Sequence, residues 1–277
     1  MAMKFRACFV FVVCVLTVCL GTTQTQPTEQ ELKNRLSAQF LVVRGMYNGS
    51  LLSFDAQGNL LGTSGTAPFG ASALRVDRVR LQGDMLGIRA MRCGLVFSGG
   101  TDSPEPGEVH AVPLKGQKVT IMIARDAAHP EGVDAALGNV FSIGIDEKLA
   151  STLPGYWQPW VHRYLHPDQP VTAVAAVAAM FQMLKEHPEI KPPRLIRAPD
   201  PAFSAAAKAR KFQGMAVLGL MVDRNGDPQD IFIRQPLGMG LDEEAVRAVS
   251  QYKFKAAMKD GEPIEVGINI QVNFRIY

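Results

Sequence analysis

The closing stretch of the chain has the most regular pattern of hydrophobic and polar positions. From residue 264 to residue 277, apolar residues take every even position and polar residues or glycine nearly every odd one. Strict alternation with a period of two residues is typical of a half-buried β-strand. We therefore expect one strand of fourteen residues, which extends roughly 46 Å at about 3.3 Å per residue. We expect it to outrun its neighbours and leave backbone groups at a sheet edge, where another strand can pair.

The preceding segment predicts the order α-β-β-α-β with the closing strand as its last element. Asp242, Glu243 and Glu244 crowd the first turn of the second helix, where the helix dipole favours negative charge. The order predicts a helix packed on a three-stranded antiparallel sheet. The expected elements are a helix at 202–211, a strand at 214–222, an Asn-Gly turn at 223–227, a strand at 229–234 and a helix at 241–252.

Residues 32–165 read mainly as β-structure, because short apolar runs alternate with Gly- and Asp-containing turns. Five to seven antiparallel strands are expected, in a small sandwich or a curled sheet. The runs at 109–114 and 119–124 are expected to be separate strands joined by a turn at 115–117. Short helices are expected at 134–141 and 147–153, with Trp157 and Trp160 packed in the core behind them.

A connector separates the two regions. Residues 171–185 are Ala-rich with apolar residues at helical spacing, which indicates a helix or a collapsed connector. Five prolines between 188 and 201 predict an extended tether reaching at most about 46 Å. The predicted fold class is α+β. Its parts are a signal peptide or short anchor at 1–21, a β-rich domain of unknown role at 28–168, a connector at 169–198 and the closing domain at 199–277.

The amino terminus has the pattern of a secretory signal. Lys4 and Arg6 precede an apolar run at 7–20, which ends at Gly21. As a helix the run rises only about 21 Å, against a hydrocarbon core of about 30 Å. We expect cleavage after Gly21 and a periplasmic protein. The alternatives are a retained inner-membrane anchor or a lipoprotein with lipid on Cys19.

Composition and charge narrow the function. A hydrophobic content of 47% suits a chain that buries a core, and a formal charge of +3 is too small to indicate nucleic-acid binding. Cleavage would leave Cys93 alone, which excludes an intramolecular disulfide and a multi-cysteine metal site. Its strand-like surroundings predict a buried structural thiol.

Candidate chemistry is sparse. His162 and His166 have the spacing that places two imidazoles on one helix face, but no third metal ligand is evident. Neither a nucleophile elbow nor a phosphate-binding loop occurs. We therefore expect no enzyme activity, no catalytic residue, no metal and no cofactor.

Spaced motifs in the last 80 or so residues resemble the carboxy-terminal domain of TonB energy transducers. The similarity covers residues 199–277, with Phe203 where the family often has Tyr and Ala256 where it usually has Pro. The motifs are Asp-Pro-Ala-Phe-Ser at 200–204, Ala-Arg-Lys-Phe-Gln-Gly at 209–214, Val-Asp-Arg-Asn-Gly at 222–226, Gly-Leu-Asp-Glu-Glu-Ala-Val at 240–246, Tyr-Lys-Phe-Lys at 252–255 and Asp-Gly-Glu-Pro at 260–263.

The resemblance implies a periplasmic domain that adds the TonB box of an outer-membrane receptor to its last strand. The family transmits force from an inner-membrane ExbB and ExbD motor to open outer-membrane transporters. Residues 7–20 lack the His and Ser that face this motor in classical transducers, and the tether is short. The residues that would bind the receptor strand are Val266, Gly267, Ile268, Asn269, Ile270, Gln271, Val272 and Asn273.

Three alternatives remain open at this level. The same sheet edge could pair with a second copy and form a homodimer. An enzyme or ligand-binding activity could lie in the β-rich region. Both edges of the sheet could be covered and recruit nothing. For receptor capture, Ile270→Pro is expected to abolish binding of extended peptides.

Overall fold

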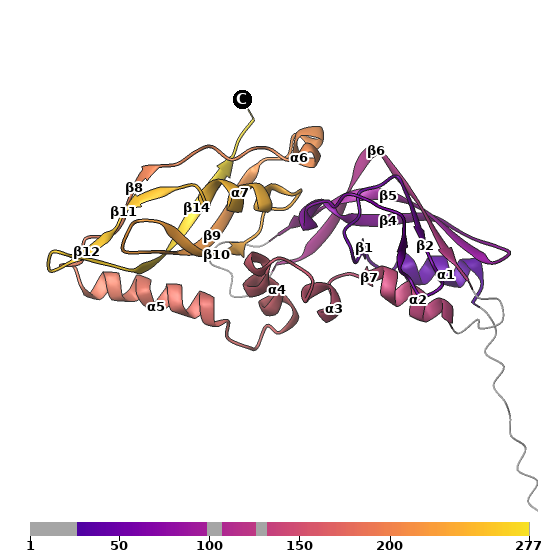
Figure 1. Cartoon of the computed structure of the whole chain (residues 1–277), viewed down its shortest axis with the longest axis horizontal. Coiled ribbons are helices and arrows are strands. Elements are labelled where there is room, and N and C mark those ends of the chain that lie inside the picture. The colour runs from indigo at the N-terminus through magenta and orange to yellow at the C-terminus, as the bar shows by residue number, and fades with distance from the viewer. Residues whose placement is uncertain (1–26, 99–106, 126–131, 277) are drawn as a thin grey trace, which may run out of the picture.

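The computed structural model describes residues 27–98, 107–125 and 132–276. They form two lobes side by side, one built from the first half of the chain and one from the second (Figure 1). In these described ranges, no helix is both long and apolar enough to cross a membrane. The expected signal at 1–21 lies outside the described residues.

The first lobe is built on one seven-stranded sheet in the order β3-β2-β6-β5-β4-β1-β7. All neighbouring pairs are antiparallel except β2 and β6, which are parallel. The sheet is therefore mixed rather than purely antiparallel. Because its seven strands form one sheet, the alternative of a two-sheet sandwich is wrong. Its strands are β1 (Leu41–Val43), β2 (Leu51–Phe54), β3 (Leu60–Leu61), β4 (Ala73–Gln82), β5 (Met85–Phe97), β6 (Val109–Ala124) and β7 (Phe141–Ile143).

Two helices cover one face of this sheet, α1 (Glu29–Leu36) and α2 (Gly132–Val140) (Figure 1). Thr28 and Glu31 form a capping box that fixes the start of α1. The inward side chains of the strands alternate with exposed ones, so Leu86, Ile88 and Ala90 of β5 are buried. The opposite face of the same strands carries the exposed positions.

The two runs expected as separate strands form the single strand β6. Both pair with the long neighbour β5, and the register shifts between Met91 and Cys93, where β6 carries extra residues. Gly116 lies in these extra residues with φ +76°, which a glycine adopts without strain. The expected turn is therefore a local bulge, because one long partner strand spans both runs.

The second lobe contains the expected three-stranded antiparallel sheet, in the order β10-β9-β14. Its elements are α6 (Ala205–Arg210), β9 (Gly214–Val222), β10 (Pro228–Gln235), α7 (Leu241–Val249), β11 (Lys253–Lys255), β12 (Ala257–Lys259), β13 (Glu262–Ile264) and β14 (Val266–Phe274). The closing strand is shorter than expected. Residues 262–264 pair with β12 in a hairpin of their own, so the alternation at 264–277 spans two elements.

The connector is folded onto the second lobe. Residues 172–186 form the helix α5 (Thr172–Glu186), as expected, and this helix lies against β14 and β9. The stretch after it is no extended tether. Lys191 bridges to Met258, and β8 (Arg194–Arg197) pairs with β11. The prolines fix an extended backbone, and residues 194–197 then use their N–H and C=O groups in a short sheet.

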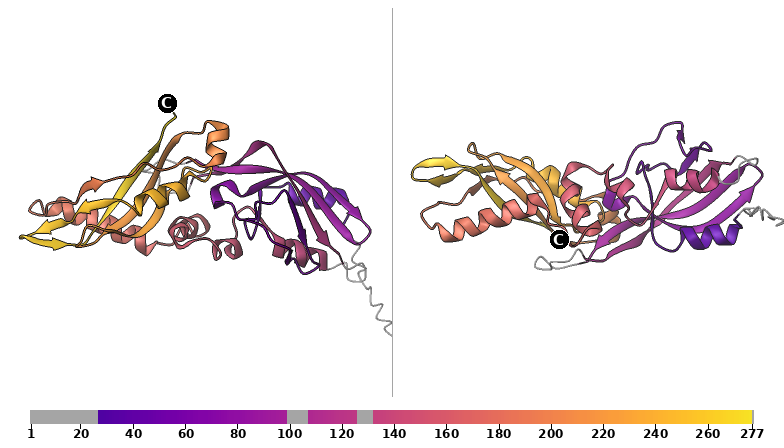
Figure 2. Two further views of the ribbon diagram at one scale, coloured as in Figure 1. Left: turned by 45° about the horizontal axis from the view of Figure 1, so that its top comes forward. Right: turned by 90° about the horizontal axis from the view of Figure 1, so that it is seen from below.

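The lobes are joined by backbone contacts and a common core. The amide of Met239 donates to the carbonyl of Leu95 at 2.7 Å, and Val96 forms a β-bridge with Gly238. Buried side chains of both lobes belong to one hydrophobic cluster, in which Leu95 and Leu218 take part. Figure 2 shows the two lobes next to each other from two further directions.

Aromatic side chains fill this junction, as the core role of the two tryptophans predicts. They come from η1 (Phe69–Ala71), β5, η2 (Gly155–Trp157) and α4 (Gln158–Leu165). Trp157 is fully buried and meets Phe69 edge to face, with ring centroids 5.1 Å apart. Cys93 is buried as expected, and burial raises the pKa of its thiol to about 11, so the thiol stays protonated and inert.

Candidate functional site

Strand β14 is the outer strand of the second lobe's sheet. It pairs with β9 along its whole length, from Val266 opposite Val222 to Phe274 opposite Gly214. Among the described residues, no strand pairs with the other side of β14. The predicted binding residues therefore lie on a free sheet edge.

Two hydrogen bonds show which backbone groups of β14 point outward. The amide of Asp223 donates to the carbonyl of Asp227, so the backbone of Asp223 points toward β10. The preceding residue, Val222, therefore points its N–H and C=O toward β14. Val266 is aligned with Val222, so its own N–H and C=O point toward β9. The amide of Ile276 donates to the side-chain Oε1 of Gln213, the residue before β9. Because these directions alternate along a strand, even-numbered residues of β14 bond to β9. The odd-numbered residues aim their N–H and C=O groups at the open edge.

Side chains of β14 divide in the same way. Val266, Val272 and Phe274 are buried, and Ile268 and Ile270 are half-buried against the core. On the opposite face the row is Gly267, Asn269, Gln271 and Asn273. Only Gly267 of that row is buried, and the other three are exposed.

Helix α5 covers the start of this second face. A Cβ built on Gly267 would lie 3.1 Å from the Cα of Val177, tighter than most Cβ contacts, so glycine favours this close approach of the helix. Val177 is itself buried. The freely accessible part of the edge therefore runs from Asn269 to Asn273.

A hollow of about 520 Å³ adjoins the far end of β14. Phe203 lies edge to face on Phe274 there, with ring centroids 5.4 Å apart. Asp200 and Arg275 add one charge of each sign to its lining. A peptide laid along the edge would meet this hollow with a side chain near its end.

The structure also reveals a pair of buried carboxylates that sequence reasoning placed only on a helix turn. Asp242 is fully buried and accepts hydrogen bonds from the amides of Leu237 and Gly238, each at 2.7 Å. Burial, reinforced by the neighbouring Glu243, raises the pKa of Asp242 to about 7. In the sequence, the motif Gly-Met-Gly at 238–240 was the available sign of this contact. It lets the chain turn so that the amides of Leu237 and Gly238 point at the carboxylate.

Glu243 joins the two lobes. Its Oε1 accepts from the indole Nε1 of Trp157 at 3.2 Å and from the amide of Gly70 at 3.4 Å. Its Oε2 has no partner, and burial raises the pKa of its carboxyl. Burial removes the carboxyl from solvent and disfavours its charged form, which is the cause of this rise in pKa.

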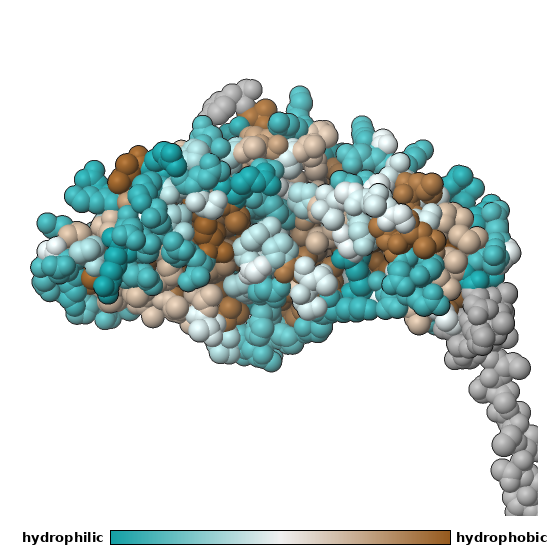
Figure 3. Space-filling model, viewed as in Figure 1, coloured by the Kyte–Doolittle hydropathy of each residue, from teal (hydrophilic) through white to brown (hydrophobic). Residues whose placement is uncertain are grey.

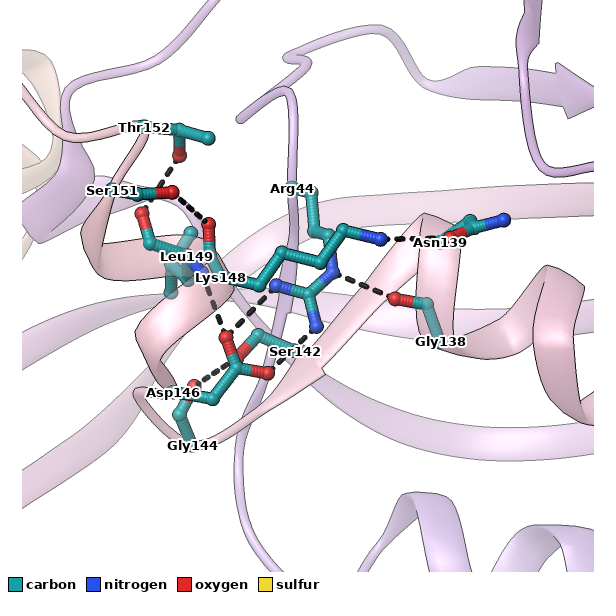
Figure 4. A network of polar contacts seen from close by, with 10 residues as sticks. All are labelled: Arg44, Gly138, Asn139, Ser142, Gly144, Asp146, Lys148, Leu149, Ser151 and Thr152. Carbon is teal, nitrogen blue, oxygen red and sulfur yellow. Dashed lines mark hydrogen bonds and ion pairs between the residues drawn. The ribbon is translucent and has the colours of Figure 1, made fainter.

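The first lobe holds its polar groups in structural networks. Arg44 donates two hydrogen bonds to the carboxylate of Asp146, at 2.8 and 2.6 Å. Its Nε donates a third to the carbonyl of Gly138 (Figure 4). Hydrogen bonding from Arg44 lowers the pKa of Asp146 to about 2. The network ties β1 to α2 and α3 (Glu147–Ala150). Its groups are paired with one another.

The two spaced histidines do come together, with ring centroids 5.0 Å apart. The Nε2 of His166 lies 2.8 Å from a carboxylate oxygen of Glu147. Across the ranges that the structure describes, no cluster of three or more side chains is arranged to hold a metal ion.

Comparison with known protein families finds a match within the second lobe. Residues 199–276 match the protein family described as Gram-negative bacterial TonB protein C-terminal. This segment belongs to the TonB carboxy-terminal family. The first lobe and the connector lie outside the match. The family is transport-associated and non-enzymatic, and its members interact with outer-membrane receptors.

A solved structure is similar to part of the chain. It is the solution NMR structure of the Pseudomonas aeruginosa TonB CTD, with 19% sequence identity and a TM-score of 0.27. The similarity covers 30% of this chain and 86% of that one. No curated protein matches the chain significantly in sequence.

Proposed function

We propose that this TonB-like envelope protein captures a short extended segment of an outer-membrane receptor as a fourth strand beside β14. The observation that carries the proposal is the open edge from Asn269 to Asn273 on a segment of the TonB carboxy-terminal family. Added strands are held mainly by backbone hydrogen bonds, so such an edge accepts varied sequences.

The bonds available to a guest strand can be counted from the register. Along the accessible part of the edge, Asn269, Gln271 and Asn273 each direct one N–H and one C=O outward. Each new hydrogen bond contributes about 0.5–1.5 kcal/mol net. The hollow beside Phe203 and Arg275 supplies a place where the guest's side chains add specificity.

The direct test is titration calorimetry of the full chain with synthetic peptides that carry receptor TonB boxes. Gln271→Pro removes an outward N–H while leaving the bonds to β9 intact, and it should weaken binding at least tenfold. Gln271→Ala is the matched control, since it changes only the side chain and should stay within about threefold. Saturable binding that Gln271→Pro leaves unchanged would refute strand addition at this edge.

The structure changes which proline variant is informative. The amide of Ile270 points toward β9, opposite Leu218, so Ile270→Pro would break the protein's own sheet. Loss of binding in that variant would report unfolding as readily as a lost contact. Thermal melting followed by circular dichroism should show Gln271→Pro close to the wild type and Ile270→Pro destabilised by several degrees.

The same open edge favours a second candidate, pairing of two copies through β14. Sedimentation of the full chain would then show a dimer that Gln271→Pro dissociates. A dimer that excludes TonB-box peptides would favour self-association over receptor capture. Coupling to an ExbB and ExbD motor would add force to receptor capture.

A further inference from the structure

The open face of the first lobe's sheet concentrates positive charge. The register aligns Arg78 of β4 opposite Arg89 of β5, and Arg75 and Lys118 flank them on the same face. All four side chains are exposed. Within the described part of the chain, none of the four has an ion-pair partner, whereas the neighbouring Arg80 contacts Glu29 at 3.8 Å.

A direct cross-strand pair of arginines is unfavourable for folding, because like charges opposite each other repel. Beside this pair lies a hollow of about 410 Å³, lined by Arg78, Arg89, Lys118 and Thr120. Asp77 is the single carboxylate in that lining. The arrangement offers several cationic donors and a hydroxyl to an anion from outside the chain.

Exposed leucines continue the same face. Leu51 of β2 is opposite Thr120, which is opposite Arg89, so these side chains share one side of the sheet. In the next row Leu61 of β3 aligns with Ser53. Leu51 is 63% exposed and Leu61 is 56% exposed. The face is thus basic on β4 and β5 and apolar on β2 and β3.

We propose that this basic and apolar face docks on the surface of a membrane that contains anionic lipid. Lipid headgroup phosphates match the unpaired guanidinium groups, and acyl chains near the headgroups match the two leucines. No aromatic side chain lies at the aligned positions of this face, so it lacks the stacking platform of single-strand nucleic-acid sites. Helices α1 and α2 lie on the other side of the sheet and leave this side accessible (Figure 1).

The face lies on the lobe outside the TonB match, so the docking is independent of peptide capture. A lobe lying flat on a membrane would hold the second lobe, and its open edge, at a set distance from that surface. Figure 3 shows that apolar residues are exposed on the first lobe in small groups among hydrophilic ones. Contact with lipid therefore needs charge and leucines together.

The test is cosedimentation of the full chain with vesicles of phosphatidylcholine, with or without 30% phosphatidylglycerol as a chosen anionic lipid, on the order of physiological salt. The triple variant Arg75→Gln, Arg78→Gln, Arg89→Gln should lower partitioning into anionic vesicles about 100-fold, at about fivefold per cation. The control Arg194→Gln, Lys255→Gln, Lys259→Gln removes the same charge from exposed positions of the other lobe. It should change partitioning less than twofold.

A second readout locates the contact. Leu51→Trp places a fluorophore on the face, and lipids brominated on the acyl chain should quench it only in anionic vesicles. The buried Trp157 and Trp160 set the background, which the wild type measures. The apolar amino-terminal run is present in every variant and so cancels in the comparison.

Equal loss in the two triple variants, or a loss on neutral vesicles as large as the loss on anionic vesicles, would overturn the proposal. Binding to soluble heparin, with no quenching by brominated lipid in Leu51→Trp, would also overturn it, because the face would then bind polyanions rather than lipid. Anion-dependent binding that only the Arg75, Arg78 and Arg89 substitutions weaken, together with quenching, supports membrane docking.

Discussion

Single residues at the junction carry much of what couples the two lobes. Glu243 is 8% exposed and reaches Trp157 and Gly70 of the first lobe from the start of α7. Asp242 beside it is fully buried. Because both carboxyls titrate above their usual range, this contact depends on pH.

The first prediction concerns that dependence. Unfolded Asp242 loses its proton near pH 4, but the folded residue keeps it until about pH 7. The stabilising effect is complete below about pH 4 and is lost as pH rises through about 7, by on the order of 4 kcal/mol in all. Urea unfolding at pH 5 and pH 8 should show the lower free energy of unfolding at pH 8.

Glu243→Gln should flatten this slope. The substitution replaces Oε2, which has no hydrogen-bond partner, by an amide nitrogen, and Oε1 still accepts its two hydrogen bonds. It also removes the repulsion between the Glu243 and Asp242 carboxylates. Glu244→Gln, one residue further along α7, should keep the slope of the wild type. A slope unchanged by Glu243→Gln would contradict the assignment.

At the scale of elements, α5 decides how much of the β14 edge is accessible. The helix rests on the sheet where Gly267 and Val177 nearly touch, and it leaves Asn269, Gln271 and Asn273 exposed. The helix is mostly exposed itself, with Phe181 53% exposed. Its attachment therefore depends on a small buried contact around Val177.

The second prediction follows from this close approach. Gly267→Leu forces a side chain against the backbone of Val177 and should detach α5 while the β9 to β14 pairing persists. Hydrogen exchange of the α5 amides should accelerate at least tenfold, with the β9 amides still protected. Asn269→Leu is the control, because that neighbouring position is exposed. Protected α5 amides in Gly267→Leu would show that the helix does not rely on this contact.

At the scale of the molecule, the TonB segment is not a free domain on a flexible tether. Its β-bridge from Gly238 to Val96 and its shared hydrophobic cluster bind it to the first lobe. A guest strand captured at β14 would thus pull on both lobes together. Force on the receptor segment would be transmitted through the junction rather than through a linker.

The third prediction tests this junction. A Cβ on Gly238 would lie 2.1 Å from the carbonyl oxygen of Leu95, and the φ of Gly238 is +107°. Gly238→Ala should lower the free energy of unfolding by at least about 2 kcal/mol and separate the lobes. Small-angle scattering should show a larger radius of gyration. Gly261→Ala has a similar positive φ of +88° with no neighbour within 4 Å, so it measures backbone strain alone. Equal effects of the two substitutions would show that the contact contributes nothing.

Local patterns predicted the second lobe well. The strand at 214–222 and the turn at 223–227 have the expected bounds, because period-two alternation and the Asn-Gly pair act over a few neighbouring residues. The errors arose where a partner strand decided the outcome. The 115–117 bulge, the parallel pairing of β2 with β6 and the split at Glu265 each depend on contacts distant in sequence.

By itself the sequence determined that the last segment is a TonB carboxy-terminal domain closing on an amphipathic strand, since motifs and alternation reside in consecutive residues. Only the tertiary structure decided which backbone groups of that strand point outward, because the direction depends on the register with β9. It likewise decided that the proline-rich connector folds back and that Glu243 links the lobes. The burial of charged groups and the pairing of strands depend on contacts between segments that are distant in sequence. Patterns of neighbouring residues therefore do not predict them.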